Sequence, residues 1–215
     1  MQPSFWHQLW ESNRLGFHKS KPHPLLVRYF GELSLPKGSR IFLPLCGKTL
    51  DIGWLLSQGY RVAGAELSKI AIEQLFSELG IEPTISNLGA VSLYSSKEKG
   101  LDIFVGNIFD VSREILGTVD AIYDRAALVA LPPEVRNRYT AHLMELTNQA
   151  PQLLITFEYD QSKMEGPPFS ISETEITQHY NNSYESSLLI SKNVAGGLKS
   201  AGAAKENVWL LQQRK

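Results

Sequence analysis

The chain has 215 residues, 43% hydrophobic and 20% charged, and its 21 basic and 22 acidic side chains leave a net charge of −1. This composition is typical of a soluble enzyme and argues against a disordered chain, and the evenly mixed charge lacks the basic face of a nucleic-acid-binding protein. No apolar run reaches the roughly 18 residues of a membrane span, and the amino terminus lacks the pattern of a signal peptide. The single cysteine excludes an intramolecular disulfide and favours a cytoplasmic protein.

The length predicts one domain over residues 1–215, with an N-terminal cap segment (1–34) ahead of an α/β core (35–215). A balanced charge and a complete core make a monomer the expected state, and composition favours a small-molecule substrate over nucleic acid or membrane.

Short apolar runs alternate with helix-length segments, the pattern of a doubly wound, mostly parallel α/β sheet. The predicted strands are 39–45, 61–66, 101–105, 119–123, 152–158, 186–192 and 207–212. The predicted helices are 50–58, 68–79, 134–150 and 172–180. Ser68 is expected to cap the second helix and Gly80 to end it. We expect the last two strands to pair antiparallel at one edge, a turn at 95–100, and a loop near a site at 161–168.

Gly47, Lys48 and Thr49 look like the end of a phosphate-binding loop. Such a loop follows G-x-x-x-x-G-K-[ST], because its backbone amides must wrap the phosphates. The position of its first glycine is occupied by Phe42, and Pro44 removes a further amide. The sequence therefore argues against a nucleoside triphosphatase.

Glu66 ends the second predicted strand, where an acidic side chain can accept hydrogen bonds from a ribose diol. From the residues alone, a solvated strand-end acid or a helix cap fits equally well. The dinucleotide fingerprint is incomplete, because only Gly47 and Gly53 are present after the first strand. An adenosine ligand without phosphates, such as S-adenosylmethionine, does not need those glycines. This favours a methyltransferase over a nicotinamide-dependent oxidoreductase with a degenerate fingerprint.

Several segments, in their order and spacing, resemble the thiopurine S-methyltransferase family, and its bacterial members most closely. They are Trp6-x-x-x-Trp10, Gly16-Phe17-His18, FLPLCGK (42–48), GAELS (64–68), GNIFDV (106–111), YDRAALVALPPEVRNRY (123–139), EGPPF (165–169) and VWLL (208–211). The resemblance implies the seven-stranded class I methyltransferase fold, with an antiparallel edge strand and an N-terminal helical lid. The segment 181–206 departs from the family's pattern, which leaves substrate-side residues there unassigned.

The resemblance also implies site residues. The cofactor-binding positions it indicates are Trp6, Trp10, Leu45, Gly47, Glu66, Asn107, Ile108 and Arg125, with Asn107 and Ile108 flanking the adenine. Phe17 matches an aromatic residue close to both substrate and cofactor. Trp6 and Trp10 are four residues apart and share a helix face, so docking of that helix on the core is an alternative role.

The implied chemistry is an in-line methyl transfer to the sulfur of thiopurines and other aromatic or heterocyclic thiols. It needs no metal, and S-adenosylhomocysteine is the product. We expect Asp124 and Arg125 to follow the fourth strand, and Arg125 and Phe17 to be the catalytic residues, with Arg125 facing the acceptor; His18 is a weaker candidate for proton transfer. Alternatives are a selenium or tellurium acceptor, the nicotinamide-dependent oxidoreductase, and a non-catalytic binding domain.

Overall fold

The computed structural model describes residues 3–12 and 21–214, and it divides into two compact units, residues 1–121 and 122–215. Phe17 and His18 lie outside the described residues. None of the helices in the described ranges is long and apolar enough to cross a bilayer.

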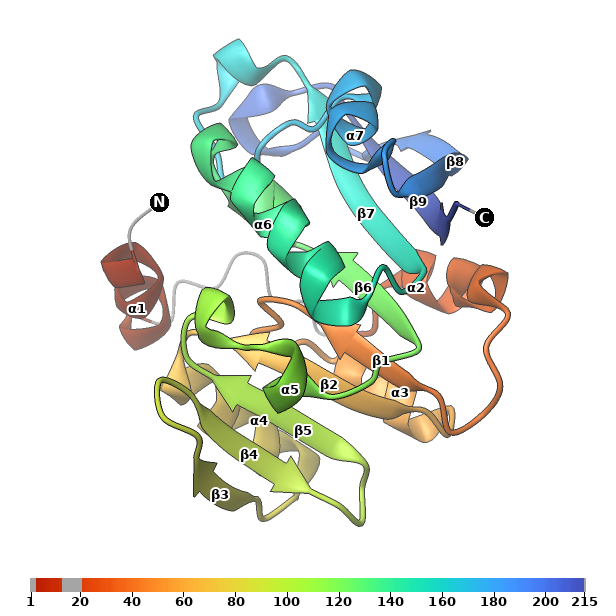
Figure 1. The fold of residues 1–215 in the computed structure, drawn as a ribbon. Helices are drawn as coiled ribbons and strands as arrows, with labels where there is room; N and C mark the ends of the chain where they lie inside the picture. Colours follow the sequence, from red (N-terminus) through yellow and green to blue (C-terminus); the bar gives the residue numbers. More distant parts are fainter. Residues whose placement is uncertain (1–2, 13–20, 215) are drawn as a thin grey trace. The chain divides into compact units, whose positions relative to one another are not determined.

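The strands of the first unit lie in the order β3–β4–β5–β2–β1 (Figure 1). Their bounds are β1 (Arg40–Leu43), β2 (Arg61–Glu66), β3 (Thr84–Asn87), β4 (Ser92–Ser96) and β5 (Leu101–Val105). β1, β2 and β5 are parallel neighbours, whereas β4 pairs antiparallel with β5 and β3 with β4. The carboxyl ends of the three parallel strands therefore meet at one edge of the sheet, where ligands of such folds bind.

Helices α3 and α4 of the first unit both pack against β2. The helices of this unit are α1 (Pro3–Glu11), α2 (Pro24–Tyr29), α3 (Asp51–Ser57), α4 (Lys69–Leu79) and α5 (Arg113–Leu116), with short 3-10 turns η1 (Phe30–Leu33) and η2 (Ile108–Asp110). Because this packing covers β2, its residues from Val62 to Glu66 are all buried. The N-terminal segment up to residue 34 contributes α1, α2 and η1.

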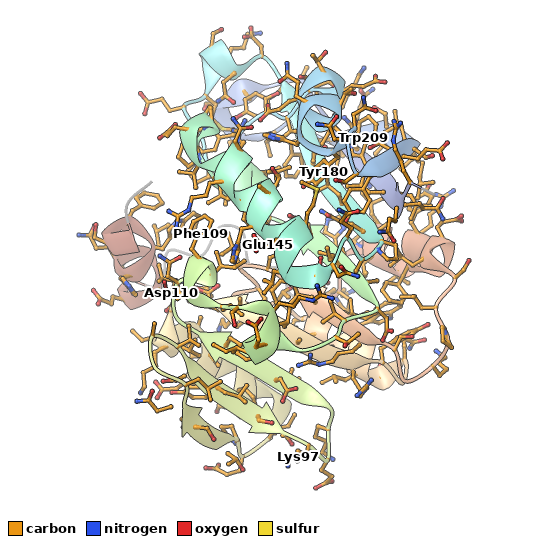
Figure 2. The ribbon with its side chains drawn as sticks, viewed as in Figure 1. Lys97, Phe109, Asp110, Glu145, Tyr180 and Trp209 are labelled. Carbon is orange, nitrogen blue, oxygen red and sulfur yellow. The ribbon has the colours of Figure 1, made fainter. Side chains whose placement is uncertain are left out.

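The second unit has the strand order β6–β7–β9–β8. Its elements are β6 (Ala121–Arg125), η3 (Leu128–Ala130), α6 (Pro133–Thr147), β7 (Gln152–Tyr159), η4 (Gln161–Lys163), α7 (Glu173–Tyr180), β8 (Tyr184–Asn193), η5 (Lys199–Ala201) and β9 (Ala204–Gln213). β6 and β7 are parallel, and β9 and β8 add two antiparallel strands. Aromatic side chains fill its core, among them Tyr180 of α7 and Trp209 of β9, both labelled in Figure 2.

All seven predicted strands and all four predicted helices are present, and β2 and β5 have the predicted bounds. The predicted ends of α4 are confirmed: the Ser68 hydroxyl accepts the N–H of Ala71 at 3.3 Å, and Gly80 closes the helix in the left-handed region at φ 65°. Helix α6 ends earlier than predicted, because Asn148 is left-handed as well.

Two further strands, β3 and β4, were not predicted. All residues of β3 are exposed, and in β4 only Tyr94 is buried, so neither strand carries an apolar alternation. The predicted turn at 95–100 is therefore wrong at Ser95 and Ser96, which belong to β4.

Strand β6 is shifted by two residues from the predicted 119–123. Asp124 and Arg125 are consequently the last two residues of the strand and do not follow it. The sequence does not indicate this shift, because a polar residue such as Asp124 suggests the end of a buried strand, whereas here it is fully buried and hydrogen-bonded within the strand.

Candidate active site

The turn that leaves β1 carries two residues with left-handed backbone, Leu45 at φ 46° and Gly47 at φ 54°. Between them, the N–H of Cys46 donates to the carbonyl of Ala65 at 3.0 Å, which holds the turn against the end of β2. A leucine in this region is strained, and such strain gathers at ligand sites. The strained backbone makes the turn a candidate ligand contact, and Leu45 and Gly47 are the positions that the resemblance implies there.

Glu66, the last residue of β2, is buried with 7% of its surface exposed. Its Oε2 accepts the N–H of Gly47 and its Oε1 accepts the N–H of Ser68, each at 2.8 Å. Burial raises the pKa of Glu66, while the N–H groups of Ser68, Gly47 and Leu67 and the nearby His7 act in the opposite direction. A carboxylate has about four acceptor positions, so these backbone contacts leave acceptor capacity for a ligand. The residues present thus fit a ribose diol.

The same geometry disagrees with a phosphate ligand. The N–H of Gly47, which a phosphate-binding loop would aim at a phosphate, is taken by the Glu66 carboxylate. Lys48 does not point into the turn but forms an ion pair with Glu78 of α4 at 2.6 Å. A carboxylate beside the turn would also repel a phosphate group.

Trp10 of α1 is buried, with 4% of its surface exposed. Its indole ring packs on the turn after β1: a Cβ atom built on Gly47 would lie 3.1 Å from Cζ2 of Trp10. Only glycine leaves room for the ring there. The structure thus brings Trp10, Gly47 and Glu66 together. Trp6 is half-buried on the same helix, with its ring at 5.3 Å from that of Phe5.

Asn107 and Ile108 follow β5, the parallel neighbour of β2. The N–H of Gly106 donates to the carbonyl of Glu66 at 2.9 Å, so the two strand ends are joined directly beside Asn107. Asn107 caps η2 by accepting the N–H of Phe109 at 3.1 Å, and Ile108 is buried. The adenine-flanking positions implied by the resemblance therefore lie at the same sheet edge as Glu66.

Arg125 belongs to the second unit and ends β6. Its side chain is half-buried, and no hydrogen bond or ion pair of its guanidinium is found within the described residues. Phe17, the other predicted catalytic residue, lies outside those residues.

Asp124 lies one residue earlier, within β6. It is fully buried, and its Oδ2 accepts the hydroxyl of Tyr139 at 2.7 Å. Burial raises its pKa to about 6.

Gly64 of β2, which the sequence analysis does not assign to the site, is tightly enclosed. A Cβ atom there would lie 2.9 Å from Sγ of Cys46 and 2.8 Å from Cδ1 of Ile103. The signal in the sequence was a glycine inside an otherwise apolar strand, which often marks a close approach.

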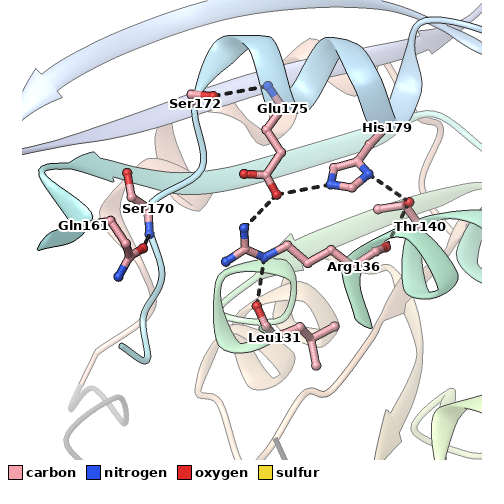
Figure 3. Close-up of polar contacts among 8 residues, drawn as sticks. All are labelled: Leu131, Arg136, Thr140, Gln161, Ser170, Ser172, Glu175 and His179. Atoms are coloured by element: carbon pink, nitrogen blue, oxygen red, sulfur yellow. Dashed lines mark hydrogen bonds and ion pairs between the residues drawn. The ribbon is translucent and has the colours of Figure 1, made fainter. Parts of the chain in front are cut away.

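The predicted loop after β7 is held by a network of polar contacts (Figure 3). The N–H of Ser170 donates to Oε1 of Gln161 at 2.8 Å. On the adjoining helices, the buried Arg136 donates to Glu175 at 2.6 Å and to the carbonyl of Leu131 at 2.8 Å. Burial by itself raises the pKa of Glu175, but hydrogen bonds from His179 and Arg136 outweigh it and lower the pKa.

The chain is similar to known proteins over nearly its whole length. The family model described as "Thiopurine S-methyltransferase (TPMT)" matches residues 1–214. A thiopurine S-methyltransferase of Xanthobacter autotrophicus is 50% identical over 99% of this chain and 100% of its own length. Another, from Teredinibacter turnerae, is 50% identical over 99% of this chain and 98% of its own length.

Among solved structures, the chain resembles the 1,6-didemethyltoxoflavin-N1-methyltransferase of Burkholderia thailandensis, which was crystallised with 1,6-didemethyltoxoflavin and S-adenosylhomocysteine. The TM-score is 0.66 at 14% identity, over 99% of this chain and 87% of that one. The fold is thus the α/β fold of class I S-adenosylmethionine-dependent methyltransferases, with parallel strands and antiparallel edge strands, as predicted.

Within that class, the chain belongs to the thiopurine S-methyltransferase family. Its cofactor is S-adenosylmethionine and its reaction is methyl transfer, which decides against the nicotinamide-dependent oxidoreductase.

Proposed function

We propose that this enzyme transfers the methyl group of S-adenosylmethionine to the sulfur of thiopurines and other aromatic or heterocyclic thiols. One observation carries the proposal: curated relatives named thiopurine S-methyltransferase match the chain end to end at up to 50% identity. The geometry of the first unit is compatible with it, because Glu66 keeps acceptor positions for a ribose and the turn after β1 has no phosphate cradle.

The proposed cofactor site uses side chains of the first unit. Glu66 accepts hydrogen bonds from the ribose hydroxyls, and Asn107 and Ile108 flank the adenine. Leu45 and Gly47 lie in the turn beside the methionine portion of the cofactor. Trp10 covers that portion, together with Trp6 on the same helix. An aromatic face next to a sulfonium gains about 0.5–2 kcal/mol from cation–π attraction, so Trp10 would contribute to affinity.

S-Adenosylmethionine, when bound, supplies a methyl group on a positively charged sulfur. The chain's own task is then to hold the acceptor sulfur in line, and such positioning can supply roughly 7–11 kcal/mol of the barrier. Arg125 donates hydrogen bonds to ring nitrogens or to the thiolate of the acceptor, and its planar fork suits both. Phe17 borders the acceptor.

A methyl-transfer assay with a panel of acceptors tests the proposal. Purified enzyme and S-adenosylmethionine are incubated with a thiopurine, an aryl thiol or selenite, and the methylated product is identified by mass spectrometry. We expect the thiopurine and the aryl thiol to be methylated on sulfur, and a Glu66→Ala variant to lose most of this turnover. Methylation of selenite alone would overturn the thiol assignment.

We further infer a monomer located in the cytoplasm, since the chain has a single cysteine and a balanced charge. Size-exclusion chromatography with light scattering checks the first inference; a mass near twice 24.1 kDa would contradict it.

A further inference from the structure

The end of β6 is a buried carboxylate followed at once by a strained turn. Asp124 is fully buried, and its Oδ1 accepts the N–H of Leu128 at 3.1 Å while its Oδ2 accepts the hydroxyl of Tyr139 at 2.7 Å. The N–H of Ala127 also stabilises the charged carboxylate. All these partners are neutral donors, so the carboxylate is held by hydrogen bonds and not by an ion pair.

Between Asp124 and those N–H groups the chain reverses through Ala126, whose φ is 64°. An alanine in the left-handed region is unfavourable by itself, and it persists only where the surroundings fix it. The carboxylate of Asp124 reaches across the turn to residue 128 and supplies this constraint. Arg125 directly precedes Ala126 and leads into this turn.

The turn is also anchored on its far side. The N–H of Phe169 donates to the carbonyl of Val129 at 2.6 Å, which ties η3 to the loop after β7. Strand pairing fixes the near side, because Asp124 and Arg125 are in register with Leu154 and Ile155 of β7. Arg125 is thus the junction between the paired strand and the turn, and the conformation of residues 126–128 constrains the backbone on its C-terminal side.

Burying a carboxylate costs more free energy than burying an apolar side chain of similar volume. Replacing buried charged groups by apolar ones of similar volume is often neutral or stabilising, and burying an ionised group is unfavourable unless its oxygens are hydrogen-bonded. A leucine or methionine would fill the position beside Tyr139 but would accept no N–H from the turn. The carboxylate therefore has a role that an apolar side chain could not replace, which is to accept the N–H groups of the turn.

We propose that Asp124 is a positioning residue for methyl transfer: its carboxylate holds the turn of residues 125–128 in its left-handed form and so directs Arg125 toward the acceptor. The proposal rests on the function proposed above for Arg125. It makes no claim that Asp124 touches substrate or cofactor.

The test is a set of variants assayed with whichever acceptor the enzyme methylates. Asp124→Ala should lower kcat/KM about 30-fold, less than the roughly 10²–10³-fold seen when a catalytic hydrogen-bond donor is itself removed, because Arg125 is still present. Asp124→Asn should lose less than fivefold, because its carbonyl oxygen can still accept the N–H of Leu128. Affinity for S-adenosylhomocysteine should change less than twofold in both variants.

Two double variants separate positioning from simple stability. In an Arg125→Lys background, Asp124→Ala should cause little further loss, since a misdirected side chain and a missing guanidinium remove the same contact. Adding Ala126→Gly to Asp124→Ala should restore activity severalfold, because glycine adopts the left-handed region freely. Ser34→Gly, another left-handed position at φ 52°, is the matched control and should restore nothing.

The variants distinguish failure of the proposed role of Arg125 from failure of the proposed role of Asp124. If Arg125→Lys leaves turnover unchanged, the role of Arg125 is wrong and this proposal falls with it. If Arg125→Lys impairs turnover but Asp124→Ala multiplies the loss independently, only the positioning role is overturned. If Asp124→Ala does not fold, Tyr139→Phe removes the hydroxyl that donates to Oδ2 of Asp124 and should lower kcat/KM about threefold. An unchanged value, together with no rescue by Ala126→Gly in Asp124→Asn, would reject the proposal.

Discussion

Replacement of Glu66 by alanine tests whether its carboxylate binds the cofactor or only caps the backbone. The carboxylate accepts the N–H groups of Gly47 and Ser68, the N–H of Leu67 also stabilises it, and acceptor capacity remains for the ribose. Hydrogen bonds to charged groups contribute about 1.5–3 kcal/mol each. Loss of even one raises the dissociation constant of S-adenosylhomocysteine about 10- to 150-fold.

Titration calorimetry at 25 °C and neutral pH measures this constant directly. Glu66→Ala also leaves the N–H groups of Gly47 and Ser68 without their acceptor, which costs about 1–3 kcal/mol each, partly offset because a buried charge is removed. Urea denaturation therefore has to accompany the titration, so that affinity is compared on folded protein. The matched control is Glu73→Ala, because Glu73 is an exposed carboxylate on α4 paired only with Lys69, and it should leave affinity within twofold.

One result would refute the reasoning. If folded Glu66→Ala binds S-adenosylhomocysteine as tightly as the wild type, the carboxylate serves only to cap the turn after β1 and the start of α4. Glu66→Gln sharpens the comparison: its carbonyl oxygen replaces one acceptor and its amide faces the other N–H, so we expect an affinity below that of the wild type.

Three further outcomes are expected. Trp10→Ala removes the ring that packs on Gly47 and should weaken S-adenosylhomocysteine binding about 2- to 30-fold by calorimetry, with far-ultraviolet circular dichroism unchanged; unaltered affinity would reject the role of cover. Gly64→Ala places a methyl group 2.9 Å from Sγ of Cys46 and should lower the free energy of unfolding by about 1–3 kcal/mol, with partial recovery in Gly64→Ala/Cys46→Ala. Because burial raises the pKa of Asp124 from 3.8 to about 6, the folded chain holds this proton more tightly than the unfolded chain. The wild type should therefore lose up to about 3 kcal/mol of unfolding free energy relative to Asp124→Asn as pH rises from 4 to 7, and a difference that does not vary with pH would contradict this.

The parallel core of the fold could be predicted from the sequence because its strands are buried on both faces and read as apolar runs. β2 is the clearest case, buried from Val62 to Glu66 and ended by a charged residue followed by a helix cap. The edge strands β3 and β4 could not be predicted in this way. β3 pairs with β4, and β4 with β5, through backbone hydrogen bonds on an exposed surface, which leaves no periodic pattern in the side chains.

Within the candidate site, the positions fixed by strand topology were predictable and those fixed by distant packing were not. Glu66 ends β2 and Gly47 lies in the turn after the parallel neighbour β1, so their proximity is implied by the alternation of strands and helices. The contact of Trp10 with Gly47 depends on how a terminal helix docks, and the bond from Tyr139 to Asp124 joins residues 15 positions apart. Neither contact has a local sequence signature.

The only cysteine in the sequence lies within the turn that holds the candidate cofactor residues. Cys46 is buried, and burial followed by the charge of Glu66 raises the pKa of its thiol well above the ordinary value. A thiol reagent can attack only when the turn opens, because the thiolate is the reactive form. Alkylation of this single thiol, read by mass, therefore records the first opening of the turn in each molecule, and its rate reports how readily the turn opens without any engineered label.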